Sequence, residues 1–189
     1  EFINAVRMAD EKGVPIIDIG IGLNTGIAIV GEMGSSGRSD YTVIGDPINL
    51  GSRLESLCKY YNSKLNISNF TKEKLKGDYI FRFLDLVTVK GKSEPIEIWQ
   101  IHDVAHTMKQ NLYGVSYEQL NKELSLYHTA IEYYQKASFE KALSIFKEIE
   151  GWDNKTNEAI YQIYIERCLH YIAYPPQAFN GVFVHTSKG

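Results

Sequence analysis

Cysteine is scarce in this sequence. Its two cysteines, Cys58 and Cys168, lie far apart and belong to no Cys-x-x-Cys motif or Cys/His cluster. That spacing argues against a disulfide scaffold and against a zinc site. The cysteine usage therefore fits a reducing compartment, and the cytoplasm is the expected location.

Long apolar runs are missing as well. No stretch approaches the roughly 18 consecutive apolar residues of a transmembrane helix, and the N-terminal residues 1–13 do not resemble a signal peptide. We therefore expect a soluble segment. The sequence starts inside a helical pattern, because Phe2, Ala5, Val6 and Ala9 share one face with no capping residue before them. This start predicts that the chain is cut from a longer protein.

An excess of charge of one sign is also lacking. Twenty Lys and Arg stand against 23 Asp and Glu, with no long run of either sign. Such a balance gives no basic surface of the kind that follows a nucleic-acid backbone or an anionic membrane. We therefore expect neither nucleic acid nor, for this segment, a membrane as partner.

Residues 1–103 have the pattern of alternating strands and helices. Strands are predicted in VPIIDIGIGL, IAIVGEM and Tyr41–Ile44, the last two joined as a hairpin. Asp46 is expected to cap a helix that has Pro47 at its first position and runs to about Tyr60. A short strand at about 65–68, a small helix near 71–78 and two longer strands at about 79–89 and 95–102 should follow.

From about residue 104 the pattern becomes helical. The segment YYQKASFEKALSIFKEI resembles one tetratricopeptide (TPR)-type helical hairpin. One such unit cannot bury its own apolar face, so we expect the tail to dock on the preceding half or on a dimer mate. The residues expected to line the packed faces of three tail helices are Tyr127, Ile131, Tyr134, Phe139, Leu143, Phe146, Ile160, Tyr164 and Cys168.

Three segments have features of a phosphate-binding site. The glycines of GIGLNTG precede a strand rather than a helix, so they are expected to allow tight turning and close backbone packing instead of binding a dinucleotide. GEMGSSGR lacks the ending of a P-loop and reads as a hairpin connection. Lys90 and Lys92 in VKGKS are either solvated charges at a strand end or a phosphate-binding pair. The residues alone leave both readings open.

Asn49 and Arg53 stand four residues apart near the start of the expected helix after Asp46. They share one face, beside the apolar stripe of Leu50, Leu54 and Leu57. A guanidinium fork near the positive end of a helix dipole suits an anion. The alternative at this stage is an ordinary arginine paired at the surface.

Three motifs in a fixed order decide between these readings. GIGLNTG, GSSGRSDYTVIGDPIN and SRLE, followed by VKGK, resemble the second half of a class III adenylate/guanylate cyclase catalytic domain. The resemblance implies an α+β fold with a ferredoxin-like core and a mainly antiparallel sheet in residues 1–103, followed by an all-α TPR-like tail in residues 104–189. YIERC and the following PP resemble the tails of bacterial receptor-type cyclases.

The resemblance also assigns roles to residues. It implies that Asn49 contacts the ribose, that Arg53 stabilises the transferring phosphate, and that Thr42 helps to choose the purine, with ATP favoured over GTP. Lys92, or alternatively Lys90, would hold the terminal phosphates. The implied reaction converts ATP to cyclic AMP and pyrophosphate.

Two departures from the family pattern bear on activity. Gly51 stands where the family usually has Ala, which lowers helix propensity by about 1 kcal/mol but allows a close approach. The family binds two Mg²⁺ (or Mn²⁺) through aspartates of the domain's first half, and no aspartate here lies in that motif. The resemblance therefore implies that this chain alone is inactive and that it contributes no metal ligand.

The resemblance finally implies a setting. Family cyclases dimerise so that the metal aspartates of one subunit meet the Asn and Arg of the other, which predicts a homodimer. The parent is expected to be a bacterial membrane-bound receptor that reaches the membrane only through upstream segments. The alternative hypothesis is a non-catalytic cyclase-like module that binds nucleotide or a protein partner, with the helical tail as its interaction surface.

Overall fold

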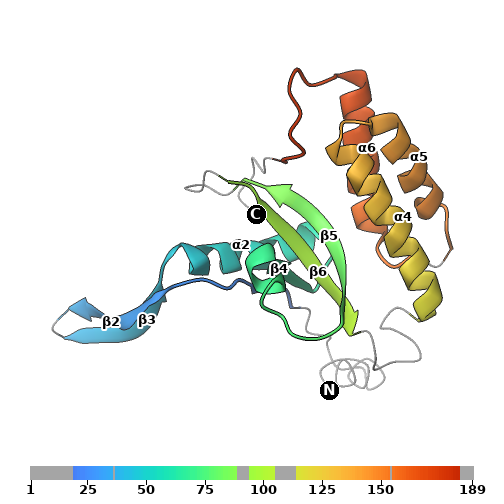
Figure 1. The fold of residues 1–189 in the computed structure, drawn as a ribbon. Helices are drawn as coiled ribbons and strands as arrows, with labels where there is room; N and C mark the ends of the chain where they lie inside the picture. Colours follow the sequence, from blue (N-terminus) through green and yellow to red (C-terminus); the bar gives the residue numbers. More distant parts are fainter. Residues whose placement is uncertain (1–18, 36, 89–93, 105–113, 154, 184–189) are drawn as a thin grey trace, which may run out of the picture.

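The computed structural model describes residues 19–35, 37–88, 94–104, 114–153 and 155–183, with a sheet and hairpin preceding a group of three helices (Figure 1). Lys90, Lys92 and the helical pattern of residues 1–13 lie outside the described residues. Within the described part, no helix is long and apolar enough to cross a membrane.

A four-stranded sheet forms the centre of the N-terminal half. Its strands are β1 (Ile21–Leu23), β4 (Leu65–Ser68), β5 (Tyr79–Val87) and β6 (Ile96–Val104), in the order β1-β4-β6-β5. β1 pairs with β4 in parallel, and the other two pairs are antiparallel. The mixed, largely antiparallel sheet confirms the predicted α+β class.

The predicted hairpin consists of β2 (Ile29–Ser35) and β3 (Arg38–Ile44). Its two strands are paired up to Ser35 and Arg38, so most of the segment 34–40, expected as the connection, is strand. It projects from the body of the molecule as a two-stranded arm (Figure 1). Tyr41 and most of its apolar neighbours on the hairpin are exposed. A two-stranded ribbon has no core of its own, so this arm offers apolar surface to another element or molecule.

Helix α2 (Asp46–Tyr61) packs against β1 and β4 through buried Leu50, Leu54 and Cys58. A Cβ added at Gly22 would lie 2.2 Å from the Gly51 carbonyl oxygen, so only glycine lets strand and helix approach this closely. The expectation that the GIGLNTG glycines serve close packing is confirmed at this position.

Two helix starts differ from the prediction. The N-cap of α2 is Gly45, at φ 141°, and Asp46 is already helical without a side-chain capping bond. A φ in this range favours glycine, so Gly45 is the N-cap and the helix begins at Asp46, one residue earlier than predicted. Helix α3 spans Asn69–Lys72 rather than lying near 71–78, because Ser68 Oγ accepts the Thr71 amide and caps it there.

Three helices form the tail: α4 (Tyr117–Gln135), α5 (Phe139–Glu150) and α6 (Glu158–Ala173). They pack side by side next to β5 (Figure 1). Of the tail residues expected to pack, all are buried except Leu143, which is half-buried. The buried apolar residues of α2, β5, β6 and the tail form one continuous cluster. The TPR relationship and the division at residue 103 stay predictions.

Candidate functional site

The candidate site begins on the outer face of α2. Asn49 and Arg53 are exposed there, while Leu50 and Leu54 on the neighbouring face are buried against the sheet. Within the described residues, neither the Asn49 nor the Arg53 side chain has a hydrogen-bond or salt-bridge partner. The surface-paired reading of Arg53 therefore finds no support in the described residues, and the guanidinium is available to an anion.

A set of polar contacts fixes the start of α2, and sequence reasoning missed it. Asn24 Nδ2 donates to the Pro47 carbonyl oxygen at 3.0 Å, and Asn24 Oδ1 accepts from Ser68 Oγ at 2.6 Å. Thr25 and Thr71 bring their hydroxyl oxygens within 3.1 Å. The NTG of GIGLNTG thus ties the first turn of α2 to the β4–α3 junction. The sequence signal that could have indicated these contacts was the polar pair Asn24 and Thr25 after Gly20 and Gly22.

Thr42 lies on β3, opposite Gly31 of β2. Its side chain is half-buried while those of its strand neighbours Tyr41 and Val43 are exposed, as strand alternation predicts. β3 ends two residues before α2 begins, so Thr42 and the Asn49/Arg53 pair are carried by consecutive elements. The structure thus joins three of the five predicted site residues in one β3–α2 unit. Lys90 and Lys92 lie outside the described residues.

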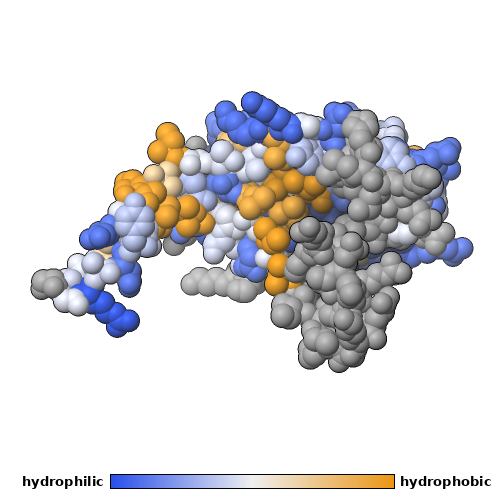
Figure 2. Space-filling view, turned by 90° about the horizontal axis from the view of Figure 1, so that it is seen from below, coloured by the Kyte–Doolittle hydropathy of each residue, from blue (hydrophilic) through white to orange (hydrophobic). Residues whose placement is uncertain are grey.

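An apolar surface adjoins this unit. Figure 2 shows apolar residues gathered on the projecting hairpin and, separately, nearer the middle of the molecule. Ile27 is 95% exposed and Tyr41 75% exposed. The other large apolar residues exposed on or just before β1, on the hairpin and at the start of α2 are Ile19, Ile21, Leu23, Ile29, Val30, Met33, Val43, Ile44 and Ile48. Exposed apolar area of this extent next to the candidate site is typical of a surface that packs against another polypeptide segment.

Buried charged and tyrosine side chains lie away from this face, between β5 and the tail. Arg82 on β5 pairs with Glu123 on α4 at 3.1 Å, and Asp85 pairs with Arg167 on α6 at 2.7 Å. Burial, with the added effect of the Asp85 carboxylate, raises the pKa of Tyr61 well above its usual value. These groups are buried and hydrogen-bonded to each other, so they hold the tail to the sheet.

Metal-ligating side chains do not gather in larger groups within the described residues. These residues contain no group of three or more His, Cys, Asp or Glu side chains placed to hold a metal ion. Asp40 on β3 and Asp46 at the start of α2 are exposed. The expectation that this chain contributes no metal ligand stays a prediction.

Comparison with known proteins now adds to the geometry. The family model of the adenylate and guanylate cyclase catalytic domain matches residues 1–103. The terminal-differentiation specific adenylate cyclase of Dictyostelium discoideum is 36% identical over 162 residues, which cover 82% of this chain and 7% of that protein. An adenylate cyclase of Anabaena cylindrica is 38% identical over 94 residues, covering 48% of this chain and 19% of that protein.

A solved structure is also similar. The guanylyl cyclase Cya2 shares 29% identity, with 59% of this chain and 55% of that chain covered and a TM-score of 0.44. The chain spans less than a fifth of the length of the two adenylate cyclases above. The family model nevertheless matches more than half of this chain. The chain belongs to the class III adenylate/guanylate cyclase family, through a catalytic-domain segment in its first 103 residues.

Proposed function

We propose that this chain is the C-terminal part of an adenylate cyclase that converts ATP to cyclic AMP and pyrophosphate for intracellular signalling. The observation that carries the proposal is the exposure of Asn49 and Arg53, one turn apart on an anchored helix and unpaired among the described residues. Family membership supplies the reaction type, and the relatives named as adenylate cyclases favour ATP.

In the proposed reaction the ribose 3′-hydroxyl loses its proton and its oxygen bonds to the α-phosphorus, while the bond from that phosphorus to pyrophosphate breaks. The leaving pyrophosphate takes up the proton, so the reaction balances. Negative charge grows on the α-phosphate oxygens. The Arg53 guanidinium stabilises that charge, a contribution of about 3–4 kcal/mol when such a donor is preorganised. Asn49 orients the ribose, which brings the reacting atoms into line.

Substrate recognition falls to the remaining predicted residues. Thr42 contacts the purine and favours adenine, which its half-buried position on β3 allows. Lys92, or alternatively Lys90, holds the terminal phosphates as a point charge. Both lysines lie outside the described residues, so their part rests on the resemblance of the VKGK loop.

The metal ions are proposed to come with another part of the protein. The family binds its metal ions through aspartates of the catalytic domain's first half, and no aspartate of this chain lies in that motif, so we propose that Mg²⁺ (or Mn²⁺) is bound through residues absent from this chain. This chain alone is then inactive.

The proposed assembly is a homodimer through the cyclase domain. The exposed apolar hairpin supports it, since an arm with Ile29 and Tyr41 in water gains free energy when a second surface covers it. Mixing two inactive versions of the intact protein tests the assembly: one carries Arg53→Ala and the other lacks its metal-binding carboxylates. Recovered activity supports a shared site, and no recovery in a mixed dimer contradicts it.

The wider setting remains part of the proposal. We place the chain in the cytoplasmic portion of a membrane-bound receptor, with membrane contact through upstream segments alone. The curated relatives include a Dictyostelium protein as well as bacterial ones, so a bacterial source stays a prediction.

The decisive experiment is an activity assay on the intact protein. With ATP and Mg²⁺ we expect cyclic AMP and pyrophosphate in equal amounts, and no product from the 189-residue chain alone. ATP binding without turnover by the intact protein would favour the non-catalytic module instead. The Arg53→Ala variant is the control, because its loss of activity would show that the measured turnover belongs to this site.

A further inference from the structure

The carboxyl end of α2 is held by the helical tail. Asn157 Nδ2 donates to the Tyr61 carbonyl oxygen at 3.0 Å and approaches the Asn62 carbonyl oxygen at 3.4 Å. These carbonyl groups lie at the end of α2, where backbone acceptors have no intrahelical partner. A tail residue 95 positions away in sequence therefore completes the end of the helix that carries Asn49 and Arg53.

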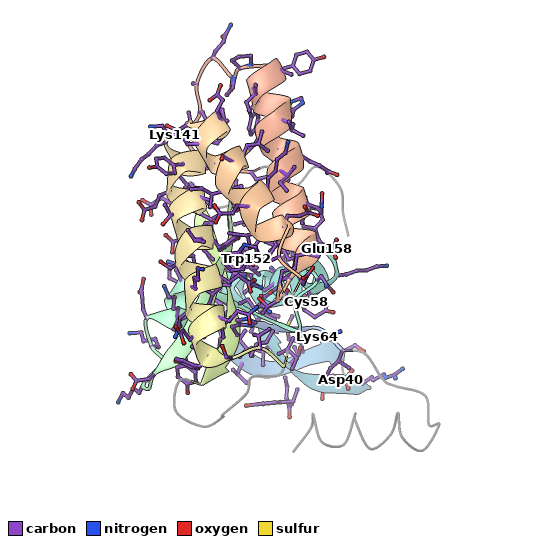
Figure 3. All side chains as sticks on the ribbon, turned by 90° about the vertical axis from the view of Figure 1, so that its right-hand side faces the viewer. Asp40, Cys58, Lys64, Lys141, Trp152 and Glu158 are labelled. Carbon is purple, nitrogen blue, oxygen red and sulfur yellow. The ribbon has the colours of Figure 1, made fainter. Side chains whose placement is uncertain are left out.

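The same Asn157 side chain begins α6. It is the N-cap of that helix, and its Oδ1 accepts the Ile160 amide at 3.2 Å. Figure 3 shows the start of α6, marked by Glu158, beside the part of α2 marked by Cys58. One buried amide group thus joins two helix ends, with its oxygen serving α6 and its nitrogen serving α2.

A second link runs parallel to the first. Tyr61, the last residue of α2, donates its hydroxyl to Asp85 Oδ2 at 2.7 Å, and Arg167 Nη2 of α6 donates to the same oxygen at 2.7 Å. All three side chains are buried. The end of α2 is therefore fixed to α6 in two ways. Asn157 contacts its backbone, and the Tyr61 hydroxyl shares the Asp85 carboxylate of β5 with Arg167 of α6.

We call the contacts of Asn157, Tyr61, Asp85 and Arg167 at the end of α2 the clamp. Its position matters because a helix moves as one rigid body. Its first turn is tied by Asn24 and its last turn by Asn157, so Arg53 lies between two fixed points. With a rise of about 1.5 Å per residue, Arg53 stands roughly 12 Å from the Tyr61 end. A small tilt at that end displaces the guanidinium, and catalytic groups must be held to within about 0.5 Å.

We propose that the helical tail is a positioning element of the cyclase site, and that Asn157 is a positioning residue that acts on Arg53 and Asn49 through α2. The proposal rests on the proposed function of those two residues. The alignment with the Dictyostelium relative is consistent with it, because at 82% of the chain that alignment extends beyond the 103 residues of the cyclase match into the tail.

Asn157→Asp in the intact protein separates the two roles of the side chain. Aspartate caps a helix about as well as asparagine, so α6 keeps its start, but the NH₂ donor to Tyr61 is lost. Asn157→Ser is the second variant, since serine also caps and is too short to bridge. Ser116→Ala is the matched control: Ser116 caps α4 at 3.1 Å, is exposed and contacts Gln119 rather than α2.

The expected result is a kcat lowered about tenfold in both Asn157 variants, with KM for ATP within about twofold of wild type. The Ser116→Ala control should lose stability but keep its kcat. A kcat in the Asn157 variants equal to that of the control, at matched folded fraction, overturns the proposal.

A readout that needs no activity keeps the two proposals apart. Hydrogen exchange of the α2 amides in residues 50–61 should be at least about fivefold faster in the Asn157 variants than in the Ser116→Ala control. If the wild-type protein proves inactive, the proposed function fails. The α2 exchange rates of the Asn157 variants and the control then still test whether Asn157 holds the helix. Equal α2 exchange in all variants then shows that Asn157 does not hold the helix.

Discussion

Arg167 of α6 donates a hydrogen bond to Asp85 of β5 at 2.7 Å, and both side chains are buried. The Asp85 carboxylate keeps the pKa of Arg167 raised although burial alone would lower it. Phe183, near the C-terminus, lies over the same guanidinium at 3.5 Å and donates its amide to the Leu86 carbonyl oxygen. The outer edge of β5 is therefore covered by the tail and by the segment that follows it.

The first prediction concerns this ion pair. Arg167→Met leaves the Asp85 carboxylate buried with one donor fewer, and removing one partner of a buried pair costs about 3–5 kcal/mol. We expect the free energy of unfolding of the intact protein, followed by tryptophan fluorescence in urea, to fall by that order. The control is Lys136→Ala, which breaks an exposed pair with Glu132 and should cost about 0.3–0.5 kcal/mol. Equal losses in the two variants would contradict the buried-pair account.

The second prediction concerns Arg53. Arg53→Ala in the intact protein should lower turnover by about two or more orders of magnitude, because the lost interaction belongs to the charge of the transition state. Folding should be unchanged, since the side chain is exposed. Asn49→Ala should act in the same direction with a smaller effect. A folded Arg53→Ala protein with wild-type turnover would remove Arg53 from the mechanism.

The third prediction is the choice of purine. The intact protein should use ATP with a higher kcat/KM than GTP, because Thr42 is expected to contact adenine. Thr42→Ala should narrow the ratio of the two constants, whereas Thr129→Ala on the exposed face of α4 should leave it unchanged. A wild-type preference for GTP would refute the adenylate assignment.

The fourth prediction concerns protection of the tail. Tyr127 and Tyr164 donate their hydroxyls to the Phe83 and Leu84 carbonyl oxygens of β5, at 2.7 Å and 2.9 Å. We expect amides in residues 120–170 of the intact protein to exchange nearly as slowly as those of β5 and β6. Hydrogen exchange read by mass spectrometry checks this, and exchange as fast as in a free linker would show that the tail is a flexible tether.

The fifth prediction is a loss of stability in mild acid. Burial first, and then the charge of Arg82, lowers the pKa of His102 to about 3 and that of His128 to about 4. The unfolded chain binds protons near the ordinary histidine pKa of about 6.5. Above about pH 6.5 the free energy of unfolding is therefore unaffected by these two histidines. It falls as the pH drops towards 4, by up to about 1.4 kcal/mol per pH unit for each histidine.

His128 offers the matched variant for that prediction. Its Nε2 accepts the Phe83 amide at 3.3 Å, which only the neutral ring can do. His128→Gln keeps an acceptor and does not titrate, so urea unfolding at pH 7 and pH 5 should show a smaller pH dependence than in wild type. An unchanged pH dependence in this variant would mean that His128 is not one of the responsible groups.

The local elements and the family could be predicted from the sequence. Strand alternation located β4 and the hairpin, the apolar stripes located the faces of α4 to α6, and the ordered motifs gave the cyclase family, because each of these signals lies within a short stretch of chain. Two helix starts were wrong for a local reason: Gly45 rather than Asp46 takes the non-helical conformation before α2, and Ser68 starts α3 early.

The docking of the tail was decided only by the tertiary structure. In sequence, Arg82, Asp85 and Asn157 carry no local sign of the partners that they have in the fold. Their partners Glu123, Arg167 and Tyr61 lie 41, 82 and 96 residues away. No local periodicity encodes such pairs, because a buried charge is stable only when a distant segment brings its counter-charge to the same place. The sequence by itself thus determined the elements and the candidate residues on α2, and the long-range packing determined what holds that helix still.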